Sequence, residues 1–387
     1  MSFPSPLRSI RLTAVFGAVL LVGIPIVAIT GLLSHVAYDP DLGRNNVVGD
    51  PGIFDFFLFD WPTHPSWLYA ATQGIHVTLG IALFPVLLAK LWSVIPKLFE
   101  WPPARSPAHA LERLSLALLV GGVLFEFATG ILNVQLYYPW HFGFVKAHYF
   151  GAWVFIAAFL FHLVVKVPAM TRALRTREQV IPAGEGSLTR RGLFALVGAG
   201  SATLLVVTAG QAVGGPLRRL AVLAPHGEDP GPGPNGFQVN KTAASVGIRP
   251  DQTDHRWRLR LAGPHGERAL ARADLAALGQ HTYDLPIACV EGWSTTQRWT
   301  GVRLRDLAAL AGAAAGGELH VQSLQKAGQF AQTTLAYNQF DDERSLLALR
   351  VNGADLSLDH GYPARIIVPA LPGVHNTKWV GVLEFRA

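Results

Sequence analysis

The chain has 387 residues, of which 50% are hydrophobic and only 15% are charged, a low share of charge for a soluble protein. The deficit lies almost entirely within the first 215 residues or so, which predicts a membrane half followed by a water-soluble domain. The formal net charge of +6 does not indicate nucleic-acid binding, because most of the clustered Arg flanks apolar spans. A single cysteine excludes an intramolecular disulfide.

Five apolar runs are long enough to cross a bilayer, which requires roughly 20 residues. They lie near residues 10–33, 67–95, 110–133, 145–170 and 192–213. Basic residues gather before the first span, between the second and third, and between the fourth and fifth, whereas the loop after the first span is acidic. By the positive-inside rule we expect a multi-pass protein of the cell membrane, in contact with membrane lipid. Its N-terminus is then cytoplasmic and its C-terminal domain extracytoplasmic.

The start of the fifth span, TRRGLF at 189–194, resembles a twin-arginine translocation motif. The alternative is that Arg190 and Arg191 are plain cytoplasmic anchors. Arg218 and Arg219 follow the span on the outer side, against the usual bias, and favour the signal. In that case the last helix and its cargo cross as a folded unit, and the twin-arginine and general secretion machineries are partners.

Three histidines lie inside predicted spans, His76 in the second and His148 and His162 in the fourth. Ionisable side chains at such depth are costly and are candidates for function. Two neutral imidazoles that face each other across a helix bundle can hold a b-type haem iron. The simplest arrangement is one haem on His76 and His148, with His162 as an alternative partner. Histidines satisfied by a hydroxyl or a carbonyl are the competing interpretation.

The segments QGIHVTLG, TGILN and AHYFGAWVFIAAFLFHLVVK resemble the cytochrome b561-type and hydrogenase-type cytochrome b membrane modules. This resemblance implies a four-helix haem module over residues 1–170, which exchanges electrons with quinone or another electron carrier. Residues 171–234 would then hold a cytoplasmic loop, a fifth helix as a twin-arginine-like anchor, and a Pro/Gly linker. Glu126 in the third span could serve quinone protonation or pair with a polar neighbour.

Residues 235–387 alternate between strand-like and helix-like patterns, which predicts an α+β domain with a substantial sheet. Strands are expected at 255–262, 283–290, 319–324, 364–369 and 379–385, and helices at 271–278 and 302–314. The apolar strand at 283–290 is expected to lead into a loop that carries Trp293.

The stretch ACVEGWSTTQRWTGVRLRDLAALA resembles the molybdopterin-binding domain of the sulfite oxidase superfamily, most closely its periplasmic methionine-sulfoxide-reductase-like branch. NGFQVNKTAASVGI, NGADLSLDHGYPARIIVP and PGVHNTKWVGVLEF support it in the same order, so that the resemblance covers residues 235–387. It implies that Cys289 ligates molybdenum beside a pterin dithiolene and is catalytic. A soft thiolate also suits such a metal on chemical grounds. A buried apolar cysteine is the alternative.

The resemblance also implies a set of pterin-binding residues: Asn235, Ser323, His360, Arg365, Gly373, Val374, His375 and Lys378. The planar fork of Arg365 suits a phosphate, and backbone N–H groups near Gly373 could add donors. His360 and His375 depart from the family pattern, which has Asn and Lys at these positions. A surface or turn role is the alternative for both.

Two absences favour reductive oxygen-atom transfer over sulfite oxidation. The basic Asn-Arg-Arg sequence of sulfite-oxidising members is replaced by the segment from Glu291 to Arg298, although Arg298 could still contact an anion. The chain also ends at Ala387, without the dimerisation domain of sulfite oxidases. We therefore expect a membrane-anchored molybdopterin oxidoreductase that acts on a small-molecule or oxidised-protein substrate and exchanges electrons with quinone through membrane haem. The alternatives are sulfite-oxidase-like oxidation on a non-haem anchor and a non-catalytic binding domain without metal.

Overall fold

The computed structural model describes residues 9–38, 58–99, 101, 105–175, 188–224, 231–328 and 330–386. The chain divides into two compact units, each built from several stretches of sequence. The helical unit comprises Met1–Gly31, Ile75–Gly210 and Gly215–Ala224, and the mixed unit comprises Leu32–Gly74, Gln211–Gly214 and Pro225–Ala387. Much of the predicted cytoplasmic loop and the first part of the predicted linker lie outside the described residues. The predicted domain boundaries stay a prediction.

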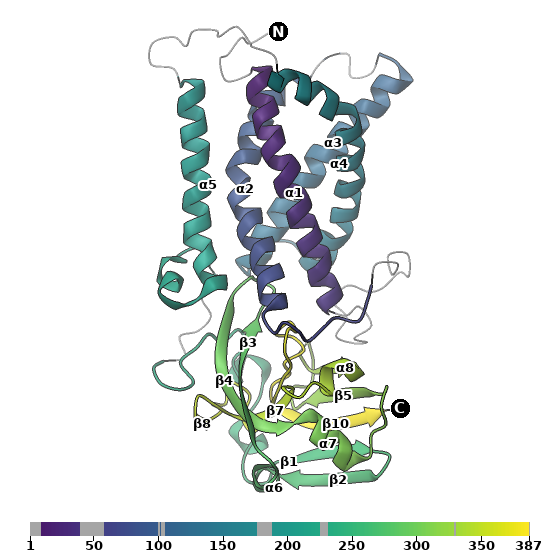
Figure 1. The fold of residues 1–387 in the computed structure, drawn as a ribbon, viewed down its shortest axis with the longest axis vertical. Coiled ribbons are helices and arrows are strands. Elements are labelled where there is room, and N and C mark those ends of the chain that lie inside the picture. The colour runs from purple at the N-terminus through teal and green to yellow at the C-terminus, as the bar shows by residue number, and fades with distance from the viewer. Residues whose placement is uncertain are drawn as a thin grey trace. The chain divides into compact units, whose positions relative to one another are not determined.

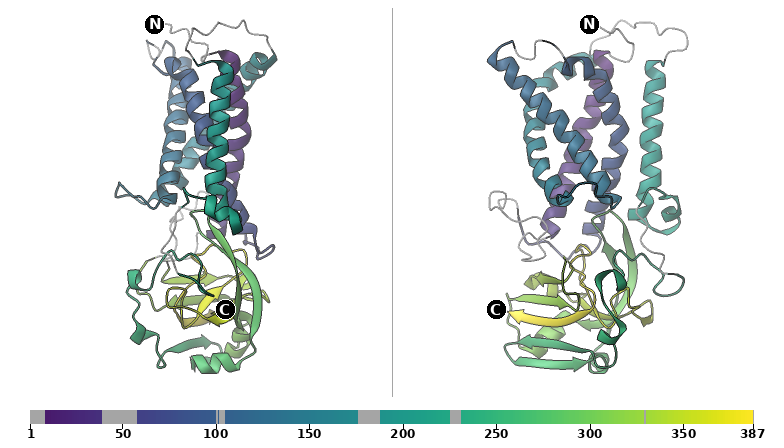
Figure 2. Two further views of the ribbon diagram at one scale, coloured as in Figure 1. Left: turned by 90° about the vertical axis from the view of Figure 1, so that its left-hand side faces the viewer. Right: turned by 180° about the vertical axis from the view of Figure 1, so that it is seen from behind.

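Five long helices match the five predicted spans (Figures 1 and 2): α1 (Ile10–Tyr38), α2 (Leu68–Leu98), α3 (Pro107–Val134), α4 (Phe144–Arg175) and α5 (Arg190–Val213). Each is long and apolar enough to cross a membrane. Five such helices indicate a multi-pass membrane protein. The C-terminal ends of α1 and α5 and the N-terminal end of α2 belong to the mixed unit.

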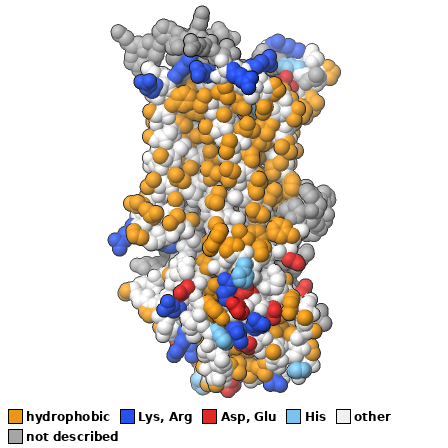
Figure 3. Space-filling model, viewed as in Figure 1, with side chains coloured by type: hydrophobic (Ala, Val, Ile, Leu, Met, Phe, Trp, Pro, Cys, Tyr) orange, Lys and Arg blue, Asp and Glu red, His pale blue; other side chains and the backbone are white. Residues whose placement is uncertain are grey.

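Small residues allow the helices of the helical unit to approach closely. A Cβ added at Gly23 of α1 would lie 2.6 Å from Cδ1 of Leu83 on α2, and one at Gly122 of α3 would lie 3.2 Å from Cβ of Phe155 on α4. Glycine at such crossings is typical of packing within lipid, where van der Waals contact drives association. On the face seen in Figure 3, apolar side chains cover the helices, and Lys and Arg gather at one end of them.

The mixed unit contains two five-stranded sheets. The first has the order β2-β1-β10-β5-β6, in which β1 pairs with β10 in parallel and the other neighbours are antiparallel. Its strands are β1 (Arg258–Gly263), β2 (Gly266–Ala271), β5 (Glu318–Ser323), β6 (Gln332–Leu335) and β10 (Val380–Arg386).

The second sheet has the order β3-β4-β7-β8, with β9 also paired to β7. Its strands are β3 (His281–Ala288), β4 (Ser294–Arg303), β7 (Leu346–Val351), β8 (Ala354–Asp355) and β9 (Arg365–Ile367). The short helices α6 (Arg272–Ala277), α7 (Leu304–Ala311) and α8 (Tyr337–Phe340) join strands of the two sheets.

The predicted α+β class is confirmed, and two of the local differences from the expected elements concern the segment that follows Cys289 and the helix after it. The expected loop after Glu291 is mostly strand, because β4 begins at Ser294 and pairs with β3 along its whole length. The helix expected over 302–314 is shorter at both ends. β4 continues to Arg303, and Gly312 adopts φ 77°, the left-handed conformation that ends a helix and favours glycine.

The segment of residues 58–74, which we call the strap, joins the core of the mixed unit. Trp61 and Tyr69 are 3% and 1% exposed and pack among core residues of the two sheets. Trp61 Nε1 donates a hydrogen bond to Ala370 O at 2.8 Å, and Ala370 N donates one to Ser66 O at 3.1 Å. A segment from between the first two predicted spans therefore supports the stretch that leads into Gly373.

Candidate functional site

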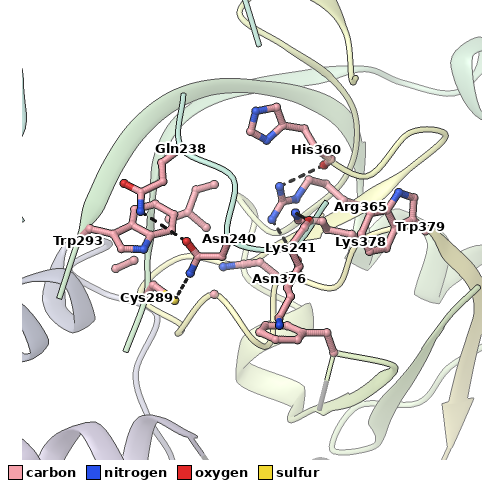
Figure 4. Close-up of a pocket in the computed structure, with 14 residues that line it drawn as sticks. Gln238, Asn240, Lys241, Cys289, Trp293, His360, Arg365, Asn376, Lys378 and Trp379 are labelled. Carbon is pink, nitrogen blue, oxygen red and sulfur yellow. Dashed lines mark hydrogen bonds between the residues drawn. The ribbon is translucent and has the colours of Figure 1, made fainter. Parts of the chain in front are cut away.

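Cys289 lies in a tight loop between β3 and β4 (Figure 4). Its N–H donates to Trp293 O at 3.0 Å, and Gly292 N donates back to Cys289 O at 2.9 Å. Gly292 has φ 87°, a conformation in which a side chain would be strained. The loop holds the thiol at the end of a buried strand, where it is 8% exposed and lines a pocket.

Two polar side chains surround the sulfur. Asn240 Nδ2 donates to Cys289 Sγ at 2.9 Å and to Glu291 Oε2 at 3.1 Å. Burial raises the pKa of the Cys289 thiol well above its ordinary value, and the carboxylate of Glu291 raises this pKa further. The thiol is therefore protonated at neutral pH, and a metal that binds it must displace that proton.

The pocket beside Cys289 is built from β3 and β9 of the second sheet and from loops of the mixed unit. It is lined by Gln238, Asn240, Lys241, Ile287, Ala288, Cys289, Trp293, Phe330, His360, Arg365, Gly373, Asn376, Lys378 and Trp379. Five predicted site residues thus line one pocket although up to 89 positions separate them in the sequence: Cys289, His360, Arg365, Gly373 and Lys378.

Arg365 lies at the start of β9 and is 3% exposed. Its Nη1 donates to His360 O and its Nη2 to Asn376 O, each at 3.1 Å. The guanidinium lies 5.2 Å from the ring centroid of Trp299. Burial lowers the pKa of Arg365 to about 9, so this cation is held at a cost that an anion in the pocket would offset.

Lys378 and His360 complete the nitrogen-rich wall of the pocket. Lys378 Nζ donates to Asp359 O at 2.7 Å and to Lys241 O at 2.9 Å. Burial, with a smaller contribution from Arg365, lowers the pKa of Lys378 to about 7. His360 stacks on Phe237 with ring centroids 3.7 Å apart. Burial and the two nearby cations lower its pKa to about 3, which leaves a neutral imidazole at physiological pH.

The other predicted pterin residues do not line the pocket but contact segments that do. The carbonyl of Asn235 lies 2.9 Å from His360 Nε2, and Ser323 Oγ donates to Lys378 O at 2.7 Å. His375 lies deeper, with Nδ1 2.8 Å from Thr333 Oγ1 and Nε2 3.1 Å from Tyr38 O. Val374, beside it, is 4% exposed. Their assignment as cofactor contacts stays a prediction.

Three further residues belong to the site although they were not predicted. Asn240 lies in the quoted segment NGFQVNKTAASVGI and Glu291 in the CVE motif, so both were present in the motifs without a role. Asn376 follows His375 and is 1% exposed. Arg298, by contrast, is paired with Asp284 at 3.1 Å and is not among the residues that line the pocket.

The residues present fit a molybdopterin. Within the described part of the chain, the buried polar atoms of this region that have no hydrogen-bond partner include Arg365 Nε, Asn376 Nδ2, Thr377 Oγ1 and Trp293 Nε1. Buried donors are nearly always satisfied, so these atoms mark a place for acceptors such as phosphate or heterocycle oxygens. A soft thiolate in the same pocket suits an oxo-metal ligand set.

In the helical unit the structure brings His76 and His148 together. Their ring centroids are 6.1 Å apart, with the rings perpendicular at 88°. His76 Nδ1 lies 2.9 Å from Val27 O, and His148 Nδ1 lies 3.0 Å from Glu126 Oε2 and 2.9 Å from Thr129 Oγ1. His162 lies fourteen residues further along α4 than His148, a rise of about 21 Å.

The contacts of this histidine pair resemble those of metal-ligating histidines. Metal-ligating histidines almost always donate their other N–H to a carbonyl or carboxylate, and both Nδ1 atoms have such neighbours. Two imidazoles that share one metal, with bonds of about 2.0 Å, have centroids about 6 Å apart. A Cβ at Gly31 would lie 2.7 Å from His76 Cε1, and one at Gly130 would lie 3.3 Å from His148 Cε1, so glycine makes room for both rings.

The low pKa of Lys378 predicts that the contribution of this residue to the stability of the cofactor-free protein rises with pH. Between about pH 7 and 10.5 the unfolded chain holds a proton on Lys378 that the folded protein lacks. The free energy of unfolding then rises with pH by at most about 1.4 kcal/mol per unit. Denaturant unfolding of cofactor-free protein at pH 7 to 9.5 measures this slope, and Lys378→Met should flatten it. Equal slopes for the two proteins would contradict the assignment.

Comparison with known proteins identifies the domain that contains this pocket. Residues 246–387 match the family described as oxidoreductase molybdopterin binding domain. The C-terminal part of the chain is therefore a molybdopterin-binding oxidoreductase domain. More particularly, it is homologous to sulfite oxidase, as its curated relatives indicate.

Mitochondrial sulfite oxidase of Mus musculus is 31% identical over 160 residues, covering 34% of this chain and 29% of the relative. The uncharacterized oxidoreductase YuiH of Bacillus subtilis is 30% identical over 132 residues, covering 34% of this chain and 65% of the relative. The crystal structure of the sulfane dehydrogenase SoxCD from Paracoccus pantotrophus matches with a TM-score of 0.32 and 24% identity, over 34% of this chain and 38% of that one. The chain thus spans under a third of the mouse sulfite oxidase and about two thirds of YuiH.

Proposed function

We propose that this protein is a membrane-anchored molybdenum enzyme that reduces an oxidised substrate by oxygen-atom transfer. One observation carries the proposal: the sole cysteine lines the same pocket as Arg365 and Lys378, next to buried donors without partners. A thiol alone would suit many roles, and a cationic pocket alone would bind many anions. Together they match the two ends of a molybdopterin, a metal to be ligated and a phosphate to be neutralised.

Some residues of the pocket would hold the cofactor, and others would shape the part of the pocket that receives the substrate. Cys289 supplies the protein ligand to molybdenum, and Arg365, Lys378 and the amide of Asn376 hold the anionic pterin. When bound, the cofactor supplies the two-electron oxygen-transfer chemistry. Asn240 orients the thiolate by donating to its sulfur.

The surroundings of Cys289 favour a neutral oxidised substrate over sulfite. Glu291 is 7% exposed and shares Asn240 with the sulfur, so a dianion at this end of the pocket would meet a buried carboxylate. A sulfoxide carries no net charge at its reacting group. The balanced reaction takes two electrons and two protons, breaks the S=O bond, and releases a thioether and water. This agrees with the methionine-sulfoxide-reductase-like branch, with a free or protein-bound sulfoxide as the substrate class.

We propose that the electrons come from quinone, or another carrier, through a b-type haem in the helical unit. The His76–His148 pair supports this, since both Nδ1 atoms lie near hydrogen-bonding oxygens and the ring spacing suits a shared iron. Glu126, which is 9% exposed and lies beside His148, is a group through which a proton can accompany the electron.

The proposed topology places the N-terminus in the cytoplasm and the domain with Cys289 outside. Basic side chains at one end of the helices (Figure 3) support that end as cytoplasmic. α5 begins at Arg190, within the twin-arginine-like motif. Export of a folded domain would allow the cofactor to be inserted before translocation.

Metal analysis and a pair of assays test the proposal. Full-length protein in detergent, from a host that makes molybdopterin, should contain close to one molybdenum per chain and oxidise reduced benzyl viologen when methionine sulfoxide is added. The same protein from a host that cannot make molybdopterin is the control. Sulfite-dependent ferricyanide reduction without sulfoxide activity would overturn the direction proposed here. Protein without molybdenum from the competent host would instead indicate a non-catalytic binding domain.

A further inference from the structure

A residue of α2, which lies far from Cys289 in the sequence, holds the loop that carries Cys289. Gln73, at the outer end of α2, is 4% exposed and belongs to the mixed unit. Its Nε2 donates a hydrogen bond to the carbonyl of Val290, the residue after Cys289. The bond joins positions 217 residues apart. Because Val290 sits within the Cys289–Trp293 turn, its carbonyl direction and that of the Cys289 side chain are coupled.

A second anchor holds the far end of the same loop. Ser294 Oγ donates to Ala212 O, near the end of α5, at 2.7 Å. α2 and α5 meet there without room for another atom, since a Cβ added at Gly74 would lie 2.8 Å from Cβ of Ala212. Gln73 and Ala212, on adjoining helix ends, thus fix both sides of the Cys289 loop.

Burial of the Gln73 side-chain amide at this position destabilises the folded protein. In the part of the chain that the structure describes, Gln73 Oε1 has no hydrogen-bond partner although it is buried, and Trp293 Nε1 in the Cys289 loop is in the same condition. Leaving such an atom unpaired costs stability. An apolar side chain of similar size would avoid this cost and still fill the space, but it would not hold the Val290 carbonyl.

We propose that Gln73 is a positioning residue of the molybdenum site, which sets the direction of the Cys289 thiolate through the Val290 carbonyl. This rests on the proposed function, because it assigns Gln73 a role towards the metal that Cys289 ligates. Residues that orient a metal ligand without binding the metal themselves typically contribute 10–100-fold to metal affinity or to activity. The outer end of α2 is then part of the active site as well as of the membrane anchor.

Gln73→Met tests the proposal, because methionine fills a similar volume without a donor. Gln73→Glu, which keeps the shape and places an acceptor against the carbonyl, is the second variant. Thr72→Val is the matched control, since the Thr72 hydroxyl contacts only carbonyls of its own helix among the described residues. Molybdenum content, the electron paramagnetic resonance spectrum of Mo(V), and kcat and KM with reduced benzyl viologen and methionine sulfoxide are measured on the full-length protein.

We expect both Gln73 variants to retain molybdenum, to show a shifted Mo(V) spectrum, and to lose about 10–100-fold in kcat with little change in KM. Thr72→Val should match the wild type. An unchanged Mo(V) spectrum and kcat in Gln73→Met would overturn the proposal, as would loss of molybdenum from both Gln73 variants, which would indicate a purely structural role. If the wild type itself contains no molybdenum, the proposed function has failed instead.

Discussion

Cys289→Ser is expected to abolish sulfoxide reduction while leaving the fold of the mixed unit in place. Serine is close in size, and its Oγ can accept the hydrogen bond that Asn240 now donates to the sulfur. A hydroxyl is a harder and far less acidic donor than a thiol, so it is a poor ligand for the metal. Substitution of a residue that only orients a metal ligand costs 10–100-fold in activity. Loss of the ligand itself should therefore cost more than about 100-fold.

Metal content and activity separate the two possible causes of such a loss. The variant should keep its unfolding temperature within a few degrees, because the exchange removes little volume, and should contain less molybdenum than the wild type. Thr282→Ala is a control on the same strand, where the threonine forms an exposed pair with Thr300 at 2.8 Å. More than about one tenth of wild-type activity in Cys289→Ser would rule out thiolate ligation, since second-sphere changes alone can cost that much.

His148→Leu is expected to remove the haem absorbance of the purified protein, and His76→Leu should do the same. The centroids of the two rings lie 6.1 Å apart, so either substitution would remove one of the two histidines proposed to hold the haem iron. Leucine fills the space and is stable in lipid. A dithionite-reduced minus oxidised difference spectrum, quantified per chain, measures the result.

His162→Leu is the matched control for this prediction, because it removes a histidine from the same helix α4. It should keep the spectrum of the wild type. Loss of the spectrum in His162→Leu with retention in His148→Leu would show that the axial pair is assigned wrongly. If the wild type shows no haem, the electron path fails while the molybdenum site is unaffected.

The five apolar spans were the feature that sequence predicted best, for a physical reason. A helix that crosses lipid must be apolar over most of its length, so hydropathy alone locates it. Cys289 is unique in the chain and lies in a motif of several residues. Strand β7 (LLALRV) was missed because a short apolar run has no periodicity that separates strand from helix. Strand β4 was missed because polar residues occupy most of its first half.

The parts of the site that sequence could not predict depend on contacts between distant segments. Nothing near Gln73 indicates that it contacts Val290, since the bond depends on how α2 meets the Cys289 loop. Trp61 reads as an ordinary aromatic residue near a membrane interface, yet it is 3% exposed and bonded to Ala370. Asn240 carries no sign in sequence that its amide reaches a sulfur 49 residues away. Only folded geometry reveals these pairs.

The strap has a consequence for any attempt to separate the catalytic domain from its anchor. The chain passes from one compact unit to the other five times, at residues 31/32, 74/75, 210/211, 214/215 and 224/225. A protease cut between Ala224 and Gly231 would therefore sever only the last of these crossings. The strap, still continuous with α1 and α2, would keep its bonds to Ala370. The cleaved domain would therefore sediment with the membrane. A fragment expressed from residue 231 onward would lack Trp61 and Tyr69 and would expose the apolar surface that these two side chains cover.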